Sequence, residues 1–115
     1  MTVQTNPYSN LEWERVDELL VKKVVHGERM TATRYRFSGG GRFPNHIHPQ
    51  EQISFLIDGS ITFDLEGNSH VLIPGDLIVI PAQAPHSAQA GADGAEVLSL
   101  VSPPRRDGDR IALID

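Results

Sequence analysis

Turn-forming residues recur at intervals of about eight to twelve positions along most of this sequence, and short stretches rich in Val, Ile, Phe and Thr lie between them. β-Branched and aromatic residues fit the pleated, half-buried surface of a strand, whereas Gly, Pro, Asn and Asp allow the chain to reverse. Evenly spaced short strands are typical of antiparallel sandwiches and barrels, so the pattern predicts an all-β fold. The turn signals are His26–Gly27, Gly39–Gly41, Asp58–Gly59, Glu66–Asn68, Pro74–Asp76, Pro81–Pro85 and Gly91–Gly94.

The alternation of apolar and polar residues assigns faces to several of these stretches. Ile61, Phe63 and Leu65 fall on one face of an expected strand, because successive side chains of a strand point to opposite sides. Tyr35 and Phe37 likewise share a face, and the arginines beside them fall on the other.

Three segments carry more specific expectations. Asp58–Gly59 predicts a two-residue hairpin, because both positions tolerate a positive φ, and Glu66–Asn68 predicts the next turn. Residues 77–80 contain no polar side chain, which is typical of a strand buried on both faces.

The length of 115 residues fits one domain, residues 1–115, and no repeat or linker divides it. Residues 11–18 leave a short capped helix and an extended segment open as alternatives. From about Leu19 onward we expect strands. Residues 1–18 would then form an N-terminal arm. Residues 103–115 would form a polar C-terminal tail that wraps the barrel or docks on a second subunit.

Composition and charge exclude several classes of function. A net charge of -5 and a pI near 5.4 argue against nucleic acid as a partner, since that binding needs a basic field. No apolar run is long enough to span a membrane, and no basic amphipathic helix would lie on one. The chain has no cysteine, which excludes disulfides and thiolate chemistry. With no signal-peptide pattern at the N-terminus, we expect a cytoplasmic protein.

The stretch HIHPQEQ, residues 46–52, concentrates metal-ligand side chains. His46 and His48 are two apart, so on a strand they face the same side, and Gln52 has the same parity. Glu51 has the opposite parity and should point to solvent. His86, which follows a proline-bounded turn, is the best candidate for a ligand from elsewhere in the chain. A pair of histidines on a solvated strand face is the alternative.

At this point the sequence resembles the small single-domain cupins. The first motif of that family, G(X)5HXH(X)3-4E(X)6G, falls on Gly40, His46, His48, Gln52 and Gly59, with Gln in place of Glu. The second motif, G(X)5PXG(X)2H(X)3N, falls on Gly75, Pro81 and His86, with Gln83 and Ala90 replacing the family's Gly and Asn. The matching segment covers roughly residues 30 to 105.

The resemblance implies a cupin β-barrel, also described as a double-stranded β-helix or jelly roll. It also implies one divalent transition metal, Zn, Ni, Fe, Mn or Cu, held by His46, His48, Gln52 and His86, with one or two coordination positions open. Three imidazoles and an amide leave the full charge of such an ion uncompensated. The site should therefore be a strong electrophile that attracts an anionic, oxygenated small molecule.

Within the family, the sequence is similar to the cupins that open unsaturated monouronates and to small polyketide cyclases, which share the ligand set of three His and one Gln. That similarity makes Arg105, in SPPRRD, a candidate carboxylate-binding residue. Ser99 occupies the position of an acid that transfers a proton in the uronate cupins, and a serine needs an activating partner to act as a base. By parity, Val101 lines the interior beside Ser99, and Ser54 and Leu56 follow Gln52 on the same face. Arg36 is a second candidate for binding an anion, with a solvated strand residue as the alternative.

The resemblance implies three possible functions. The first is an isomerase, cyclase or ring-opening enzyme that works through a metal-stabilised enolate, with Ser99 as the catalytic hydrogen-bond donor. The second is a metal-dependent dioxygenase with the same ligands. The third is a cupin that binds a small ligand without turnover. Small cupins are commonly homodimers, and residues 11–25 are the expected contact between subunits.

Overall fold

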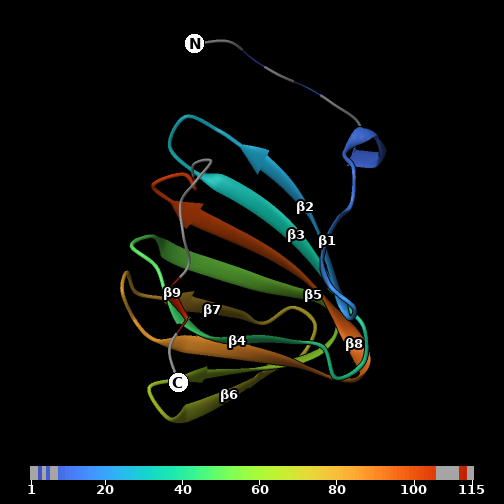
Figure 1. Ribbon diagram of the computed structural model, residues 1–115, viewed down its shortest axis with the longest axis vertical. Coiled ribbons are helices and arrows are strands. Elements are labelled where there is room, and N and C mark those ends of the chain that lie inside the picture. Colours follow the sequence, from blue (N-terminus) through green and yellow to red (C-terminus); the bar gives the residue numbers. More distant parts are fainter. Residues whose placement is uncertain (1–2, 4, 6–7, 106–111, 114–115) are drawn as a thin grey trace.

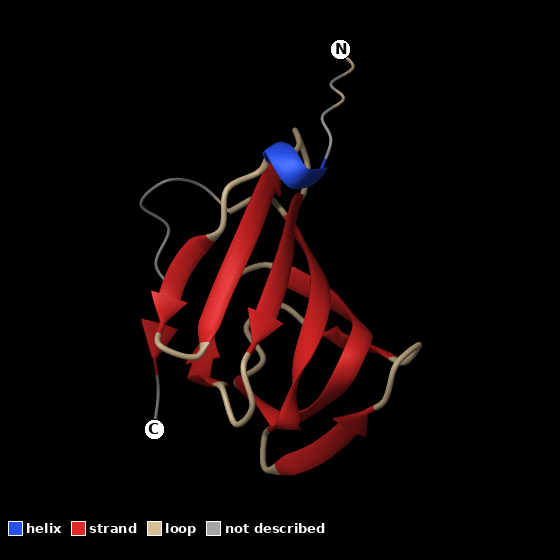
Figure 2. Cartoon of the chain, turned by 90° about the vertical axis from the view of Figure 1, so that its right-hand side faces the viewer, coloured by secondary structure: helices blue, strands red, loops and turns tan. Residues whose placement is uncertain are grey.

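The computed structural model describes residues 3, 5, 8–105 and 112–113. Within them the chain is almost entirely antiparallel strand, preceded by one turn of 3-10 helix, η1 (Tyr8–Asn10) (Figures 1 and 2). The strands are β1 (Glu14–Asp17), β2 (Leu20–His26), β3 (Thr31–Phe37), β4 (Arg42–Ile47), β5 (Glu51–Leu65), β6 (Asn68–Leu72), β7 (Leu77–Ile80), β8 (His86–Ser102) and β9 (Ala112–Leu113). The all-β fold predicted from turn spacing is confirmed.

Two long strands, β5 and β8, hold the two walls of the barrel together. They pair with each other along nearly their whole length, from Glu51↔Ser102 to Leu65↔His86. The first half of β5 also pairs with β7 and the second half of β8 with β3, which continues to β2 and β1. The second half of β5 pairs with β6, and the first half of β8 with β4, which also pairs with β9. The two groups of strands curve around a common interior (Figure 1).

The predicted hairpin at Asp58–Gly59 is wrong, and so is the predicted turn at Gly91–Gly94. Both segments lie inside continuous strands, β5 and β8, whose pairing shifts register around Gly59. Gly59 and Gly94 both have positive φ, 80° and 82°, and a Cβ on Gly59 would collide with the Gly94 carbonyl oxygen. The glycines permit a close crossing where both strands bend from one wall into the other, so the same residue types that form hairpins here form bulges.

Other sequence expectations are confirmed. Ile61 and Phe63 are buried in the core, and Glu66–Gly67 turns the chain from β5 to β6 with positive φ at both residues. Of the alternatives left open for residues 11–18, the extended one is found, since Glu14–Asp17 forms β1.

The prediction that residues 77–80 are buried on both faces is wrong. Leu77 and Val79 are 52% and 49% exposed, while Ile80 is fully buried. Strand β7 pairs only with β5 among the described strands, and one face of that wall looks outward. The absence of polar residues in this segment therefore marks an apolar outer surface.

The interior is apolar at one end and polar at the other. Leu20, Phe37 and Ile61 belong to the buried apolar cluster around the bends in β5 and β8. At the opposite end, where β5 and β8 begin and end, the buried side chains are polar, among them Ser54 and Ser99. No helix among the described residues is long and apolar enough to cross a membrane.

Candidate metal centre

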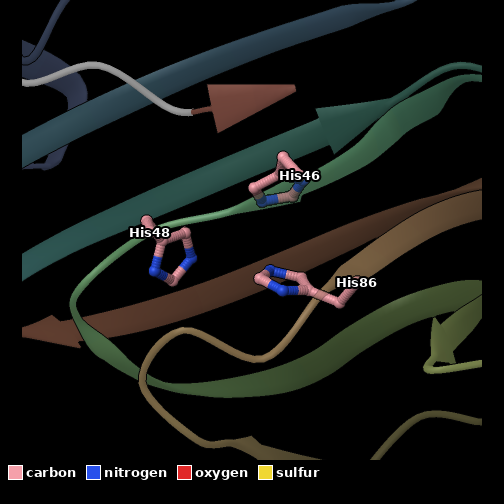
Figure 3. A group of neighbouring side chains, drawn as sticks. All are labelled: His46, His48 and His86. Carbon is pink, nitrogen blue, oxygen red and sulfur yellow. The ribbon is translucent and has the colours of Figure 1, made fainter. Parts of the chain in front are cut away.

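Three histidines from two segments distant in sequence meet at the polar end of the barrel. His46 comes from β4, His48 follows that strand directly, and His86 is the first residue of β8 (Figure 3). One nitrogen from each ring lies within 4.8 Å of the others, and all three residues are buried, with exposures of 5%, 5% and 2%. His46 and His86 are direct partners in the β4–β8 ladder, so strand pairing itself brings them together.

Each imidazole is held by a backbone carbonyl two residues away. The Nδ1 atoms of His46, His48 and His86 lie 2.7, 3.0 and 2.9 Å from the carbonyl oxygens of Pro44, Gln50 and Ala84, respectively. A carbonyl oxygen can only accept, so each Nδ1 carries the proton and donates it. In a neutral ring the Nε2 atom then keeps a lone pair, which is the arrangement that metal-binding histidines require. The Nε2 atom of His86 is buried and has no hydrogen-bond partner in the part of the chain that the structure describes.

The Gln52 side chain lies beside the three histidines and contacts His48. Its Oε1 atom lies 3.0 Å from His48 Nε2, and its amide nitrogen donates to Ser54 Oγ at 2.9 Å. Oε1 and the unprotonated Nε2 of His48 are both acceptors, so no proton joins them and their contact is unfavourable unless a cation lies beside them. Two ligand atoms bound to one cation at about 2.1 Å are themselves about 3.0–3.4 Å apart. The residues therefore fit a divalent transition-metal ion with nitrogen and oxygen ligands.

The electrostatics favour the neutral form of the His46 and His86 rings. Burial lowers the pKa of His46 to about 4; the Pro44 carbonyl opposes this shift, while His86, His48 and Arg105 add to it. Burial also lowers the pKa of His86, with His48 adding to the shift and the Ala84 carbonyl opposing it. Protons therefore compete weakly for these nitrogens near neutral pH, and the lone pairs are free for a metal.

A small cavity of about 40 Å³ opens beside the three imidazoles. That volume holds a few water molecules or the reacting end of a substrate, since one water needs about 10–15 Å³ measured this way. Aromatic and apolar side chains form most of the wall. The lining residues used below are Thr33, Tyr35, Phe43, Gln52, Ser99, Val101 and Arg105.

The structure brings most of the sequence-predicted site residues to this cavity. Ser99, Val101 and Arg105 line it together with Gln52. Ser54 and Leu56 share the interior face but lie deeper in the barrel and are not part of the lining.

Arg36 lies away from the cavity, on the outer face of β3. Its guanidinium pairs with Glu96 at 2.9 Å and stacks over the ring of Trp13 at 4.4 Å. Arg34 also pairs with Glu96. Burial raises the pKa of the Glu96 carboxyl, but the hydrogen bonds and charges of the two arginines outweigh burial and leave the pKa lowered. Strand parity explains the placement, because Tyr35 between the two arginines points inward.

Tyr35 was missed as a site residue by the sequence reasoning, which assigned it only to an apolar strand face. Burial raises the pKa of its hydroxyl, although the Arg105 charge and a hydrogen bond to Thr33 act in the opposite direction. The hydroxyl therefore stays protonated and can donate. Tyr35 has the same parity as Thr33, whose partner on β8 is Ser99, but the sequence alone does not reveal this β3–β8 pairing.

Comparisons with known proteins agree with this architecture. The sequence profile of the family described as "Cupin domain" matches residues 33–102, more than half of the chain. The structure of KdgF from Halomonas sp. is 28% identical, covers 93% of this chain and 99% of its own, and superposes with a TM-score of 0.86. The polyketide cyclase RemF from Streptomyces resistomycificus is 20% identical with a TM-score of 0.82, covering 99% of this chain and 87% of its own.

A relative was also found by sequence. Quercetin 2,3-dioxygenase from Bacillus subtilis (strain 168) is 41% identical over 49 residues, which make up 42% of this chain and 14% of that protein. This chain thus matches only a small part of that relative's length. Its match to the family profile extends from β3 to the end of β8 and includes all three histidines. The chain belongs to the cupin-domain family.

Proposed function

We propose that this protein is a metal-dependent enzyme that isomerises, cyclises or opens a small oxygenated substrate. The observation that carries the proposal is that three imidazoles, each tethered to a backbone carbonyl, converge with the Gln52 amide oxygen. Among the described residues, the buried Nε2 atom of one of them, His86, has no hydrogen-bond partner. Such a donor set fits one divalent ion of Zn, Ni, Fe, Mn or Cu. When bound, the ion would act as a Lewis acid that polarises a carbonyl and stabilises negative charge on a substrate oxygen.

The charges around the cavity favour an anionic substrate. None of the four side chains at the candidate centre is acidic, so nothing among them offsets the charge of a divalent ion. Arg105 lies close enough to act electrostatically on both Tyr35 and His46. A carboxylate on the substrate would pair with its guanidinium, as in the uronate cupins that this sequence resembles.

The remaining polar groups can donate hydrogen bonds rather than remove protons. Tyr35 keeps its proton, and the Ser99 hydroxyl has another hydroxyl, that of Ser54, as its neighbour at 2.7 Å. We assign to Tyr35 and Ser99 the stabilisation of charge on a substrate oxygen, while the aromatic wall excludes water from the reacting atoms.

The test combines metal content with a substrate panel. Purified protein is analysed for metal, stripped with a chelator, reloaded with one metal at a time, and assayed with unsaturated monouronates, other keto acids and linear polyketide analogues. We expect conversion without oxygen consumption, lost on stripping and restored on reloading. Full activity in the stripped protein would overturn the proposal.

A dioxygenase is the alternative that a specific observation favours. The 49-residue similarity to quercetin 2,3-dioxygenase supports it. Oxygen consumption with a flavonol-like substrate, restricted to the Fe- or Cu-loaded protein, would favour this alternative. A third possibility, binding without turnover, is supported by a serine at position 99 in place of the family's acid; recovery of a tightly bound ligand unchanged after long incubation would favour it.

We further propose a homodimer. Val16 on β1, Leu19 just before β2 and Val25 on β2, all within residues 11–25, are large apolar side chains with exposed fractions of 42%, 43% and 46%. Light scattering coupled to gel filtration should give twice the mass of the chain, and Val16→Lys with Val25→Lys should reduce it to that of the monomer. A monomeric wild-type protein would contradict this part of the proposal.

A further inference from the structure

Gln52, Ser54 and Ser99 form a chain of hydrogen bonds that begins at the candidate metal centre and ends at the cavity. The Gln52 amide nitrogen donates to Ser54 Oγ at 2.9 Å, and the hydroxyl oxygens of Ser54 and Ser99 are 2.7 Å apart. The two serines are direct partners in the β5–β8 ladder, which fixes their separation. Ser54 is completely buried, so bulk water does not compete for its hydroxyl.

The direction of this chain follows from counting donors. Ser54 Oγ accepts from the Gln52 amide, and its own single proton then needs an acceptor. Among the described residues, Ser99 Oγ is the group hydrogen-bonded to it that can accept. If Ser99 were the donor instead, the Ser54 proton would be buried without a partner, which is unfavourable. Ser99 therefore accepts from Ser54 and keeps its own proton for a group in the cavity, which it lines.

The same contacts show which end of the Gln52 amide faces the histidines. An amide has two ends of similar size and opposite hydrogen-bonding character. Because Ser54 accepts from the nitrogen, Oε1 is the end that lies 3.0 Å from His48 Nε2. A reversed amide would point N–H groups at the place of a cation and could not ligate it.

We propose that Ser54 is a positioning residue for the metal centre: Ser99 takes its proton, which keeps Ser54 Oγ an acceptor and so holds the Gln52 oxygen toward the cation. The inference rests on the proposed function in that it requires a bound metal. It deepens that function, because the chain leaves Ser99 as a donor beside the cation and so selects substrates that place an acceptor oxygen there.

Metal affinity tests the proposal without any assay of turnover. Zn²⁺ affinity is measured by competition with a coloured chelator near neutral pH, and the visible d–d spectrum of the Co²⁺-loaded protein reports the ligand set. Ser54→Ala should weaken Zn²⁺ binding by about 10–100-fold, the usual effect of removing a partner that orients a ligand. Ser99→Ala should also weaken binding, although Ser99 does not touch the metal, because the Ser54 proton would then turn to Gln52 Oε1 and reverse the amide.

The background variant Gln52→Glu separates orientation from packing. A carboxylate has two equivalent oxygens, so it cannot present a wrong end. In that background each serine substitution should change Zn²⁺ affinity by no more than about threefold. The difference between this small effect and the larger loss in the wild-type background would show that the serines act on Zn²⁺ binding through Gln52. Ser87→Ala, on β8 but outside the cavity lining, is the matched control and should leave affinity and spectrum unchanged.

The outcomes are separable. Equal losses in the wild-type and Gln52→Glu backgrounds would show that Ser54 acts by packing alone and would overturn the inference, as would wild-type affinity and spectrum in both serine variants. If Ser54→Ala fails to fold, judged by circular dichroism of the stripped protein, Ser99→Ala carries the test. His48→Ala tests the proposed function separately from this inference. Metal binding that survives this substitution would contradict the proposed function itself.

Discussion

His46 and His86 face each other across the β4–β8 ladder with their ring centroids 4.1 Å apart. Each ring turns its Nδ1 atom away, to the carbonyl oxygen of Pro44 or Ala84. Two buried imidazoles in contact, with their protons directed outward, leave lone pairs facing a common interior point. Strand pairing and carbonyl tethers therefore determine how these two imidazoles meet.

Replacing one histidine should remove the metal while leaving the barrel folded. His86→Ala takes away one of three imidazoles, and with it a buried Nε2 atom that has no hydrogen-bond partner among the described residues. We expect Zn²⁺ affinity to fall by at least about a hundredfold. A residue that binds the metal directly contributes more to affinity than one that only orients a ligand, whose loss costs roughly 10–100-fold. His70→Ala, at an exposed position on β6, is the control and should bind as the wild type does. Unchanged affinity in His86→Ala, measured by chelator competition, would argue against the site.

Arg105 and Arg36 should differ sharply when each is changed to Gln. Arg105 lines the cavity, so losing its charge-assisted hydrogen bond to a substrate carboxylate should raise KM by about 10–100-fold. Arg36 pairs with Glu96 on the outer face, and its removal should leave KM unchanged. Steady-state kinetics on whichever anionic substrate the panel identifies provides the measurement. Comparable KM values for wild type and Arg105→Gln would show that the anion binds elsewhere.

The metal-free protein should lose stability as the pH falls through the weakly acidic range. The pKa of His46 is about 4 in the folded state and near its ordinary 6.5 when unfolded, so between these values the unfolded chain binds more protons. Stability therefore decreases as the pH is lowered from about 6.5 toward 4. His86, whose pKa is also lowered, acts in the same direction.

Urea unfolding of the stripped protein at several pH values checks this expectation. His46→Gln, which removes one of the titrating groups, should show a flatter dependence between pH about 6.5 and 4.5 than the wild type. The same slope in both proteins would mean that His46 does not contribute.

Gly94 should tolerate no side chain. A Cβ at this position would lie 2.5 Å from the Phe37 carbonyl oxygen, and its φ of 82° already disfavours other residues. Gly94→Ala should lower the free energy of unfolding by about 2–4 kcal/mol, through backbone strain and displacement of β3. Gly67→Ala is the matched control, since φ is 87° but nothing lies within 4 Å, and it should lose only about 1 kcal/mol. Thermal unfolding of both variants makes the comparison. Equal losses of unfolding free energy would show that the clash with the Phe37 carbonyl contributes nothing.

Local pattern predicted strands such as β5 well because one face of the strand is buried, as Ile61 and Phe63 illustrate. It failed at Gly59 and Gly94, because the glycines of a hairpin and of a bulge are locally alike. Only the partner strand, here the long β5–β8 pairing, distinguishes them.

For the site too, local sequence pattern predicted some features and missed those that depend on distant strands. Parity along residues 46–52 anticipated that Gln52, and not Glu51, faces the cavity. The roles of Tyr35 and of the Ser54–Ser99 contact could not be predicted, because they depend on which residues meet across strands distant in sequence. Arg36 was a candidate only because the sequence does not reveal that Glu96 lies beside it.

The most direct measurement is a crystal structure of the Zn²⁺- or Ni²⁺-reconstituted protein with an anomalous difference map at the metal edge. We predict one peak per chain, bound at about 2.0–2.2 Å by Nε2 of His46, His48 and His86 and by the Gln52 oxygen. A map with no peak among these side chains, or with the metal held by other residues at the surface, would contradict the account.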